Sequence, residues 1–279
     1  MDKPGRTLYV SDLDGTLLGH DDRISARSLK ILNSLIERGL AFTYATARSL
    51  RSAQAVTQGL QLCLPVIVYN GCMLVCPDDE RAVYSLAFSQ TQCARLRTMA
   101  EESAAPVLVY ARIDGVERVS WISGKENNGL LHYLSNRKND PRLRAVDRFD
   151  ELFAGEPFYL TFIGEQAALR PCYDALRADR AFTCTFQQEL YRPEYWFEVM
   201  PREATKANAA RKLKQMLGFS RIVAFGDAVN DLSLFEAADQ AYAVDNAAAV
   251  LKSRADAVHA ANDADGVALW LASHSGIPI

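Results

Sequence analysis

The sequence has no excess of basic charge. Its 279 residues contain 31 Lys and Arg against 34 Asp and Glu, which gives a formal net charge of −3 at pH 7. Non-specific binding to DNA or RNA requires a clustered excess of Lys and Arg. The charge balance therefore argues against a nucleic-acid partner, and no feature of the sequence indicates an obligate protein partner.

Long apolar runs are also missing. No uninterrupted stretch of about 18 apolar residues is present, which is the length that a membrane-spanning helix needs. The first residues, Met-Asp-Lys-Pro-Gly-Arg, lead directly into a short apolar strand. They lack the roughly 7 to 15 apolar residues that form the centre of a secretory signal. We therefore expect a cytoplasmic location and no association with a membrane.

Paired cysteine motifs, internal repeats and low-complexity segments are absent as well. The six cysteines have no C-x-x-C spacing, and Cys72 and Cys76 have neither a His nor a third Cys close to them. Zinc sites and redox pairs usually need such spacing or partners. We therefore expect six buried and reduced thiols. They are Cys63, Cys72, Cys76, Cys93, Cys172 and Cys184.

Strands and helices alternate in the first part of the chain. An apolar, β-branched run at 7–11 is followed by a helical pattern at 24–38, a strand at 41–45, a helix at 50–59 and a strand at 66–69. The same alternation returns after residue 202 and continues to the end of the chain. Such alternation predicts a parallel sheet with helices on both faces, a Rossmann-like α/β fold.

The middle of the chain has a different pattern. Between residues 82 and 201, consecutive strands are joined by short turns such as Asp114-Gly115. Consecutive strands with short connections pair in antiparallel fashion, which is typical of an α+β layer. The sequence therefore predicts a split α/β core, residues 1–81 and 202–279, with an α+β domain, residues 82–201, inserted into it.

Two carboxylates follow the first predicted strand. The segment Asp12-Leu13-Asp14-Gly15-Thr16 begins where the apolar run ends. In open α/β sheets, ligands bind beyond the carboxyl ends of the strands. Two carboxylates so close together are costly unless a cation or a proton neutralises them. This turn is a candidate site for a metal and an electrophile, and the alternative is an ordinary solvated turn.

A second acidic turn has the same setting. The segment Gly226-Asp227-Ala228-Val229-Asn230-Asp231 lies after an apolar strand and before a helix. With Asp12 it offers three or four oxygen ligands, which suit a hard cation such as Mg²⁺. Neither acidic segment contains His or Cys, so zinc is disfavoured.

Two more polar positions lie at predicted helix starts. Thr46-Ala47-Arg48 follows a strand, and a hydroxyl with free backbone N–H groups at a helix start suits a phosphoryl group. On the residues alone, the simpler interpretation of Thr46 is a helix cap. Lys206 lies near the start of the helix that follows the middle block, where a cation gains nothing from the helix dipole. Taken alone, Lys206 is an exposed surface lysine.

In their order and setting, these four segments resemble the four motifs of the haloacid dehalogenase superfamily. The finer resemblance is to its Cof-type, subclass IIB phosphatases, and it covers nearly the whole chain. It implies that the inserted α+β domain is a cap of the C2B type. Ala47 and Ala207 stand where the family commonly has Gly, and neither change removes a functional side chain. Further similar segments are Asn70-Gly71, Glu198-Val199-x-Pro201, Leu232-x-Leu234-Phe235-Glu236-Ala237-Ala238, Ala243-Val244-x-Asn246-Ala247 and Asp265-Gly266-Val267-Ala268.

The resemblance implies a role for each motif residue. Asp12 is implied as the nucleophile that forms an aspartyl-phosphate, and Asp14 as the general acid and base. Mg²⁺ is expected at the side chain of Asp12, the backbone carbonyl of Asp14 and the side chain of Asp227, with Asp231 as a direct or supporting ligand. The groups expected to bind the phosphoryl oxygens belong to Thr46, Ala47, Lys206 and Asn230.

The implied function is Mg²⁺-dependent hydrolysis of small phosphomonoesters. The substrate would be a phosphorylated metabolite: a sugar phosphate, or a nucleotide or cofactor phosphate such as FMN or pyridoxal phosphate. A sugar phosphomutase shares the cap type and the aspartyl-phosphate and is an alternative. A non-catalytic sensor of phosphorylated ligands is disfavoured, because no catalytic carboxylate is missing.

The substrate itself does not follow from the core motifs, because the cap recognises the leaving group. Within the cap we expect Trp121 and Trp196 to belong to the hydrophobic core rather than to form a stacking platform. Four polar residues are either contacts to the leaving group or ordinary solvated side chains. They are Arg112, Lys125, His132 and Arg192.

Overall fold

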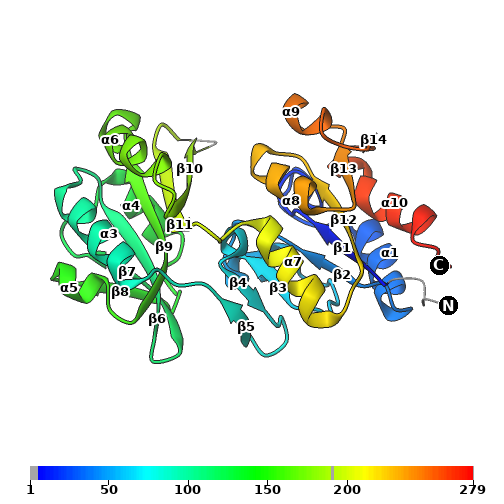
Figure 1. Ribbon diagram of the computed structural model, residues 1–279, viewed down its shortest axis with the longest axis horizontal. Helices are drawn as coiled ribbons and strands as arrows, with labels where there is room; N and C mark the ends of the chain where they lie inside the picture. Colours follow the sequence, from blue (N-terminus) through cyan, green and yellow to red (C-terminus); the bar gives the residue numbers. More distant parts are fainter. Residues whose placement is uncertain (1–5, 190–191, 279) are drawn as a thin grey trace. The chain divides into compact units, whose positions relative to one another are not determined.

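The computed structural model describes residues 6–189 and 192–278. The chain forms two compact units, coloured by sequence in Figure 1. The first unit comprises Met1–Ser85 and Thr205–Ile279, and the second comprises Leu86–Ala204. The second unit therefore interrupts the first along the sequence.

The first unit contains a parallel five-stranded sheet. In spatial order its strands are β14 (Ala257–His259), β13 (Gln240–Val244), β12 (Arg221–Gly226), β1 (Thr7–Ser11) and β2 (Phe42–Tyr44). Every neighbouring pair in this sheet is parallel. Ser11 pairs with Phe225, so the segments that follow β1 and β12 leave the sheet side by side. The predicted parallel α/β core is confirmed.

Three helices of the first unit begin at hydroxyl caps. Ser25, Ser49 and Thr205 each accept a hydrogen bond from the backbone N–H three residues further on, and so cap α1, α2 and α7. The bounds are α1 (Ala26–Glu37), α2 (Leu50–Val56), α7 (Lys206–Leu217), α8 (Leu232–Ala237), α9 (Ala249–Lys252) and α10 (Gly266–His274), with 3₁₀ turns η1 (Tyr69–Gly71), η2 (Val229–Asp231) and η3 (Asn262–Ala264).

A small antiparallel sheet completes the first unit. Its strands are β3 (Val66–Val68), β4 (Met73–Val75) and β5 (Ala82–Ser85). A parallel bridge between Ala45 and Ile67 links it to the segment after β2. The sequence pattern did not predict β4 and β5, although it predicted the equally short β2 and β3. Residues 82–85, expected in the inserted domain, pair with β4 in the first unit.

The second unit contains a mixed six-stranded sheet. In spatial order its strands are β10 (Phe182–Gln188), β11 (Tyr195–Pro201), β9 (Glu156–Gly164), β6 (Val107–Ile113), β7 (Val116–Ile122) and β8 (Leu143–Val146). Only β7 and β8 pair in parallel among these strands of the described chain. The helices are α3 (Gln90–Glu102), α4 (Asn128–Ser135), α5 (Phe149–Leu152) and α6 (Gln166–Arg177).

The two faces of this sheet have different partners. Val109, Phe162 and Phe197 point into the hydrophobic core that α3, α5 and α6 cover. Side chains alternate between faces along a strand, so Tyr110 and Trp196 lie on the other face. There they meet Tyr133 of α4, through a 3.1 Å contact between the Tyr110 and Tyr133 hydroxyls and a 5.8 Å distance between the Tyr133 and Trp196 rings.

Some expectations about single residues are corrected by the structure. All six cysteines lie in described segments and form no disulfide, but Cys63 is exposed and Cys72 alone is classed as buried. Trp121 and Trp196 lie outside the core cluster of the second unit and are only half-buried, so their assignment to that core is wrong.

Among the described residues, the helices are too short and too polar for any of them to span a membrane. The cytoplasmic location stays a prediction.

His259, the last residue of β14, lies in a cluster of rings in the first unit. Its ring centroid is 5.0 Å from that of Tyr242, 5.7 Å from that of Trp270 and 6.4 Å from that of His274. Its Nε2 is buried and has no hydrogen-bond partner among the described residues. Burial, and then the nearby imidazole of His274, lower the pKa of His259.

We expect His259 to reduce stability in mild acid. Because the pKa of His259 is lower in the folded protein, the unfolded chain binds the proton more tightly. The stability contributed above the ordinary histidine pKa of about 6.5 is therefore lost as the pH falls through the lowered value. His259→Phe should flatten the decline in Tm between about pH 7 and pH 5. The exposed His20 provides the control His20→Gln, and an equal decline in the His259→Phe protein would contradict the assignment.

Candidate active site

The four motif segments meet at the carboxyl edge of the parallel sheet. The backbone N–H of Asp12 donates to the carbonyl of Phe225 at 2.9 Å, which extends the pairing of β1 and β12 by one residue. The backbone N–H of Thr46 donates to the carbonyl of Ile67 at 2.9 Å. Because parallel strands end at the same edge, Asp12, Thr46 and Asp227 all lie there.

Lys206 is buried at the centre of the acidic cluster. Its ammonium Nζ donates to Asp12 Oδ1 at 2.6 Å and to Asp231 Oδ1 at 2.7 Å. The exposed fractions are 1% for Lys206, 4% for Asp12 and 0% for Asp231. A buried ammonium is stable only with paired anions. The interpretation of Lys206 as an exposed surface lysine is therefore wrong, and the solvated-turn interpretation fails for Asp12.

The turn η1 holds the start of α7, and hence Lys206, in place. Gly71 has φ of 101°, and a Cβ on it would lie 2.3 Å from the carbonyl oxygen of Thr205, the N-cap of α7. Only glycine permits both this backbone conformation and this approach. The resemblance singled out Asn70-Gly71, and the structure shows that Gly71 lets η1 pack against the helix that carries the central lysine.

A third carboxylate, that of Asp227, lies beside the two that bind this ammonium. Oxygen atoms of Asp12, Asp227 and Asp231 lie within 4.8 Å of one another. Burial and the charge of Asp231 raise the pKa of Asp12 well above its usual value, and the same two causes raise the pKa of Asp227 to about 6. Burial alone would lower the pKa of Lys206, but the carboxylates of Asp12 and Asp231 outweigh it and raise that pKa.

The cluster fits a hard divalent cation. Its members offer only carboxylate oxygens, the ligands that Mg²⁺ prefers. When the three carboxylates are ionised, Lys206 neutralises one negative charge and about two remain, which one divalent cation would balance. Burial is the first cause of the raised pKa values of Asp12 and Asp227, and the negative charge of Asp231 is the second. The residues present therefore suit the predicted Mg²⁺.

Asp231 holds the second acidic turn around Asp227. Its Oδ2 accepts hydrogen bonds from the backbone N–H groups of Asp227 and Ala228, both at 3.1 Å, while its Oδ1 binds Lys206. The Thr16 hydroxyl donates to Asp227 Oδ1 at 3.2 Å. Gly15 has φ of 71°, and a Cβ there would lie 2.3 Å from Asp227 Oδ2. The first acidic turn can therefore approach the second only with glycine at this position.

Asp14 is not part of the cluster, and its half-exposed side chain binds Arg48. The Arg48 Nε lies 3.1 and 3.0 Å from the two carboxylate oxygens, and Nη2 also donates to Oδ1. The hydrogen bonds to Asp14 raise the pKa of the guanidinium. A second carboxylate, Asp22, lies 3.7 Å from Nη2. Arg48 belongs to the segment Thr46-Ala47-Arg48, but the sequence indicates no role for it, since its only signal is the spacing after Thr46.

The residues expected to bind the phosphoryl oxygens differ in how far their side chains are exposed to solvent. Thr46 is fully buried, and its Oγ1 accepts the backbone N–H of Arg48 at 3.1 Å. The cap of α2 is Ser49, so the interpretation of Thr46 as a helix cap is wrong. Ala47 is half-buried. Asn230 is exposed in η2, and its amide forms no hydrogen bond with another described residue.

A family model described as haloacid dehalogenase-like hydrolase matches residues 9–271. The chain belongs to this family. The predicted family is thereby confirmed, and with it the assignment of this haloacid dehalogenase-like hydrolase as an enzyme.

Relatives of this hydrolase include proteins named as phosphatases. YitU of Bacillus subtilis, a 5-amino-6-(5-phospho-D-ribitylamino)uracil phosphatase, is 26% identical over 267 residues, which are 95% of this chain and 96% of YitU. The HMP-PP phosphatase of Klebsiella pneumoniae is 27% identical over 256 residues, 88% of this chain and 86% of that protein. A chloroplastic endoribonuclease, YBEY of Arabidopsis thaliana, is 26% identical over 282 residues, and the match spans 46% of its length.

The fold of the hydrolase is also found in solved structures. The structure of a subclass IIB sugar phosphatase of the same superfamily matches it with a TM-score of 0.74 at 21% identity. The match covers 98% of this chain and 100% of that chain. The predicted fold class is confirmed by this similarity.

Removing the central ammonium should destabilise the metal-free protein. Lys206→Met leaves three carboxylates without their cation, and breaking a buried ion pair in this way costs about 3–5 kcal/mol of unfolding free energy. Urea unfolding in the presence of a chelator measures this loss. The exposed Lys30 on α1 provides the control Lys30→Met. A loss below about 1 kcal/mol, the range of surface ion pairs, would show that Lys206 does not hold the cluster together.

Proposed function

We propose that this hydrolase is a Mg²⁺-dependent phosphatase of small phosphomonoesters that acts through an aspartyl-phosphate on Asp12. The observation that carries the proposal is the buried Asp12 held by Lys206 beside two further carboxylates at the sheet edge. The phosphatase names of several relatives support it. The first unit then carries the chemistry, and the second unit, predicted as the cap, recognises the leaving group.

Asp12 attacks phosphorus in this proposal. Lys206 binds Oδ1 and so fixes the carboxylate, and the other oxygen, Oδ2, forms the bond to phosphorus while the bond to the leaving alkoxide breaks. The side chains of Asp12 and Asp227 and the carbonyl of Asp14 would hold Mg²⁺, whose positive charge would offset repulsion between carboxylate and phosphate. Asp231 supports this arrangement by orienting Asp227, since both its oxygens already have partners.

Asp14 moves the proton. It protonates the leaving alkoxide, and it then removes a proton from the water that hydrolyses the aspartyl-phosphate. The paired contact with Arg48 orients the carboxylate for both steps. We therefore add Arg48 to the expected site residues as a positioning residue.

The remaining polar groups bind the phosphoryl oxygens. They are the Lys206 ammonium, the Thr46 hydroxyl, the Ala47 N–H and the Asn230 amide. Such donors stabilise the charge that develops in the transition state, and the loss of one typically costs roughly 3 kcal/mol of activation free energy.

Asp12→Asn should abolish phosphate release. The amide is neutral and cannot form the aspartyl-phosphate, so we expect kcat to fall by at least about 1,000-fold. The assay follows free phosphate from a panel of phosphorylated metabolites with and without Mg²⁺. Activity should require the ion.

The exposed Asp21 in the same loop provides the control Asp21→Asn, which should retain wild-type activity. A loss of less than about tenfold in the Asp12→Asn protein would rule out Asp12 as nucleophile. Transfer of phosphate between positions of one sugar, with little free phosphate, would instead identify a phosphomutase.

Arg48→Ala should lower kcat by about 10- to 100-fold, because Asp14 loses the group that orients it. Unfolding free energy should change by less than about 1 kcal/mol, since the pair is partly exposed. Arg48→Lys retains the charge but not the planar fork and should recover only part of kcat. The exposed Arg51 on α2 provides the control Arg51→Ala. An increase in KM with unchanged kcat would show that Arg48 contacts the substrate instead of positioning Asp14.

A further inference from the structure

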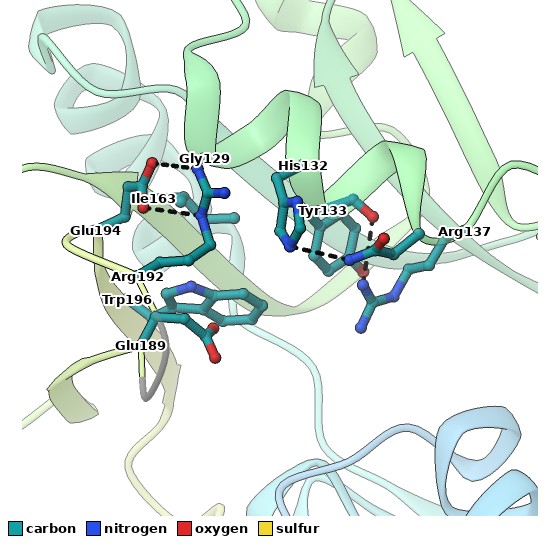
Figure 2. A pocket seen from close by; sticks show the side chains of 10 residues that line it. Gly129, His132, Tyr133, Arg137, Ile163, Glu189, Arg192, Glu194 and Trp196 are labelled. Carbon is teal, nitrogen blue, oxygen red and sulfur yellow. Dashed lines mark hydrogen bonds and ion pairs between the residues drawn. The ribbon is translucent and has the colours of Figure 1, made fainter.

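The second unit has a pocket of about 230 Å³ that includes none of the catalytic motif residues. Figure 2 shows His132 and Arg137, from α4 and the residues after it, on one side of the pocket. Trp196 of β11 and Glu189 lie on the other side. The volume is below the roughly 300–1,000 Å³ of pockets for drug-sized molecules. It suits a single small ring system.

The walls of the pocket are flat and rich in π-electrons. The Trp196 and Tyr133 rings lie 5.8 Å apart at an angle of 59°. The guanidinium of Arg137 lies 3.9 Å from the centre of the Tyr133 ring, and the imidazole of His132 faces the same pocket. Flat rings and guanidinium groups bind planar aromatic ligands by stacking.

Most polar groups that line the pocket already have partners. Arg192 donates to both carboxylate oxygens of Glu194, at 3.0 and 2.7 Å. The His132 Nε2 lies 3.1 Å from the Asn136 amide nitrogen, and Arg137 donates to the Tyr133 carbonyl at 3.3 Å. These internal contacts leave few hydrogen-bonding groups free to pair with the many hydroxyls of a sugar. Hydroxyls buried without a partner would weaken binding.

The charge of the pocket is balanced, and one carboxylate is available. Arg137 and Arg192 face Glu189 and Glu194. No positive excess remains for a second phosphate or a carboxylate of the ligand. The Glu189 carboxylate accepts no hydrogen bond from another described residue, so it can accept one from a ring N–H or an amino group.

We propose that this pocket binds a planar nitrogen heterocycle, stacked on Trp196 and hydrogen-bonded to Glu189. The phosphomonoesters that the hydrolase cleaves then carry such a ring on the leaving alcohol. This inference rests on the proposed function and narrows it, because it selects heterocyclic phosphates over simple sugar phosphates. Trp196, expected in the core from the sequence, becomes the residue that determines specificity.

The binding arm of the test needs no catalysis. Isothermal titration calorimetry with pyridoxine, uridine, riboflavin and glucose, none of which carries phosphate, measures affinity directly. At least one heterocycle should bind more tightly than glucose, and Trp196→Ala should weaken that binding by about tenfold, as expected for loss of one stacked ring. Failure of all three heterocycles to bind, or equal binding of glucose, would overturn the proposal.

The kinetic arm compares two classes of ester. We expect kcat/KM for FMN or pyridoxal 5′-phosphate to exceed that for glucose 6-phosphate, and Trp196→Ala to lower this ratio by about tenfold. Trp121 is half-buried in the same unit but does not line the pocket, so Trp121→Phe is the matched control and should retain the wild-type ratio. Glu189→Gln, which conserves the shape of the side chain, should also lower the ratio. It tests the proposal independently if Trp196→Ala does not fold.

The two proposals fail in different ways. An unchanged ratio in both pocket variants, with phosphate still released, overturns the heterocycle proposal and leaves the phosphatase proposal intact. Absence of phosphate release from every ester overturns the phosphatase proposal, and with it the claim about the leaving alcohol. The calorimetric result would then still decide whether the pocket binds a heterocycle.

Discussion

The site depends on one buried ammonium. Lys206 binds the carboxylates of Asp12 and Asp231 in a place where almost no water reaches the three side chains. Without this cation, adjacent carboxylates would repel one another in a low dielectric and take up protons. The surrounding features serve the same arrangement: Gly71 lets η1 approach the cap of α7, and Gly15 lets one acidic turn approach the other. A single ammonium does not neutralise three carboxylates, and the remaining negative charge is what makes the site suitable for a divalent cation.

The parallel core was predictable because its signals are local and periodic. The strand at 7–11 and the helical pattern before Gly39 can be recognised without knowledge of the fold, and acidic residues after two strands indicate the carboxyl edge of the sheet. The roles of Thr46 and Lys206 were not predictable from local pattern. A threonine before a helix and a lysine at a helix start have common explanations, and only the resemblance to the family selected the functional one.

The parts that the sequence did not predict depend on contacts between distant residues. The pairing of Arg48 with Asp14 joins two motifs through side chains, and no periodicity shows it. The same holds for Trp196. The alternation along β11 places it on the other face of the sheet from Phe197, but whether that face is covered depends on α4. A half-buried tryptophan in a pocket and a core tryptophan have the same sequence pattern.

The interrupted first unit has a consequence for synthesis of the chain. Asp12 and its partner Lys206 are separated by 194 positions in the sequence, and the whole second unit lies between them. At translation rates of about 5–20 residues per second, the ribosome needs about 10 to 40 s to add the lysine after the aspartate. During that interval β1 also lacks its neighbour β12, since that strand follows α7 in the chain. The second unit can thus complete its own fold first, while β1 has β2 but not β12 as a neighbour until the last quarter of the chain is made.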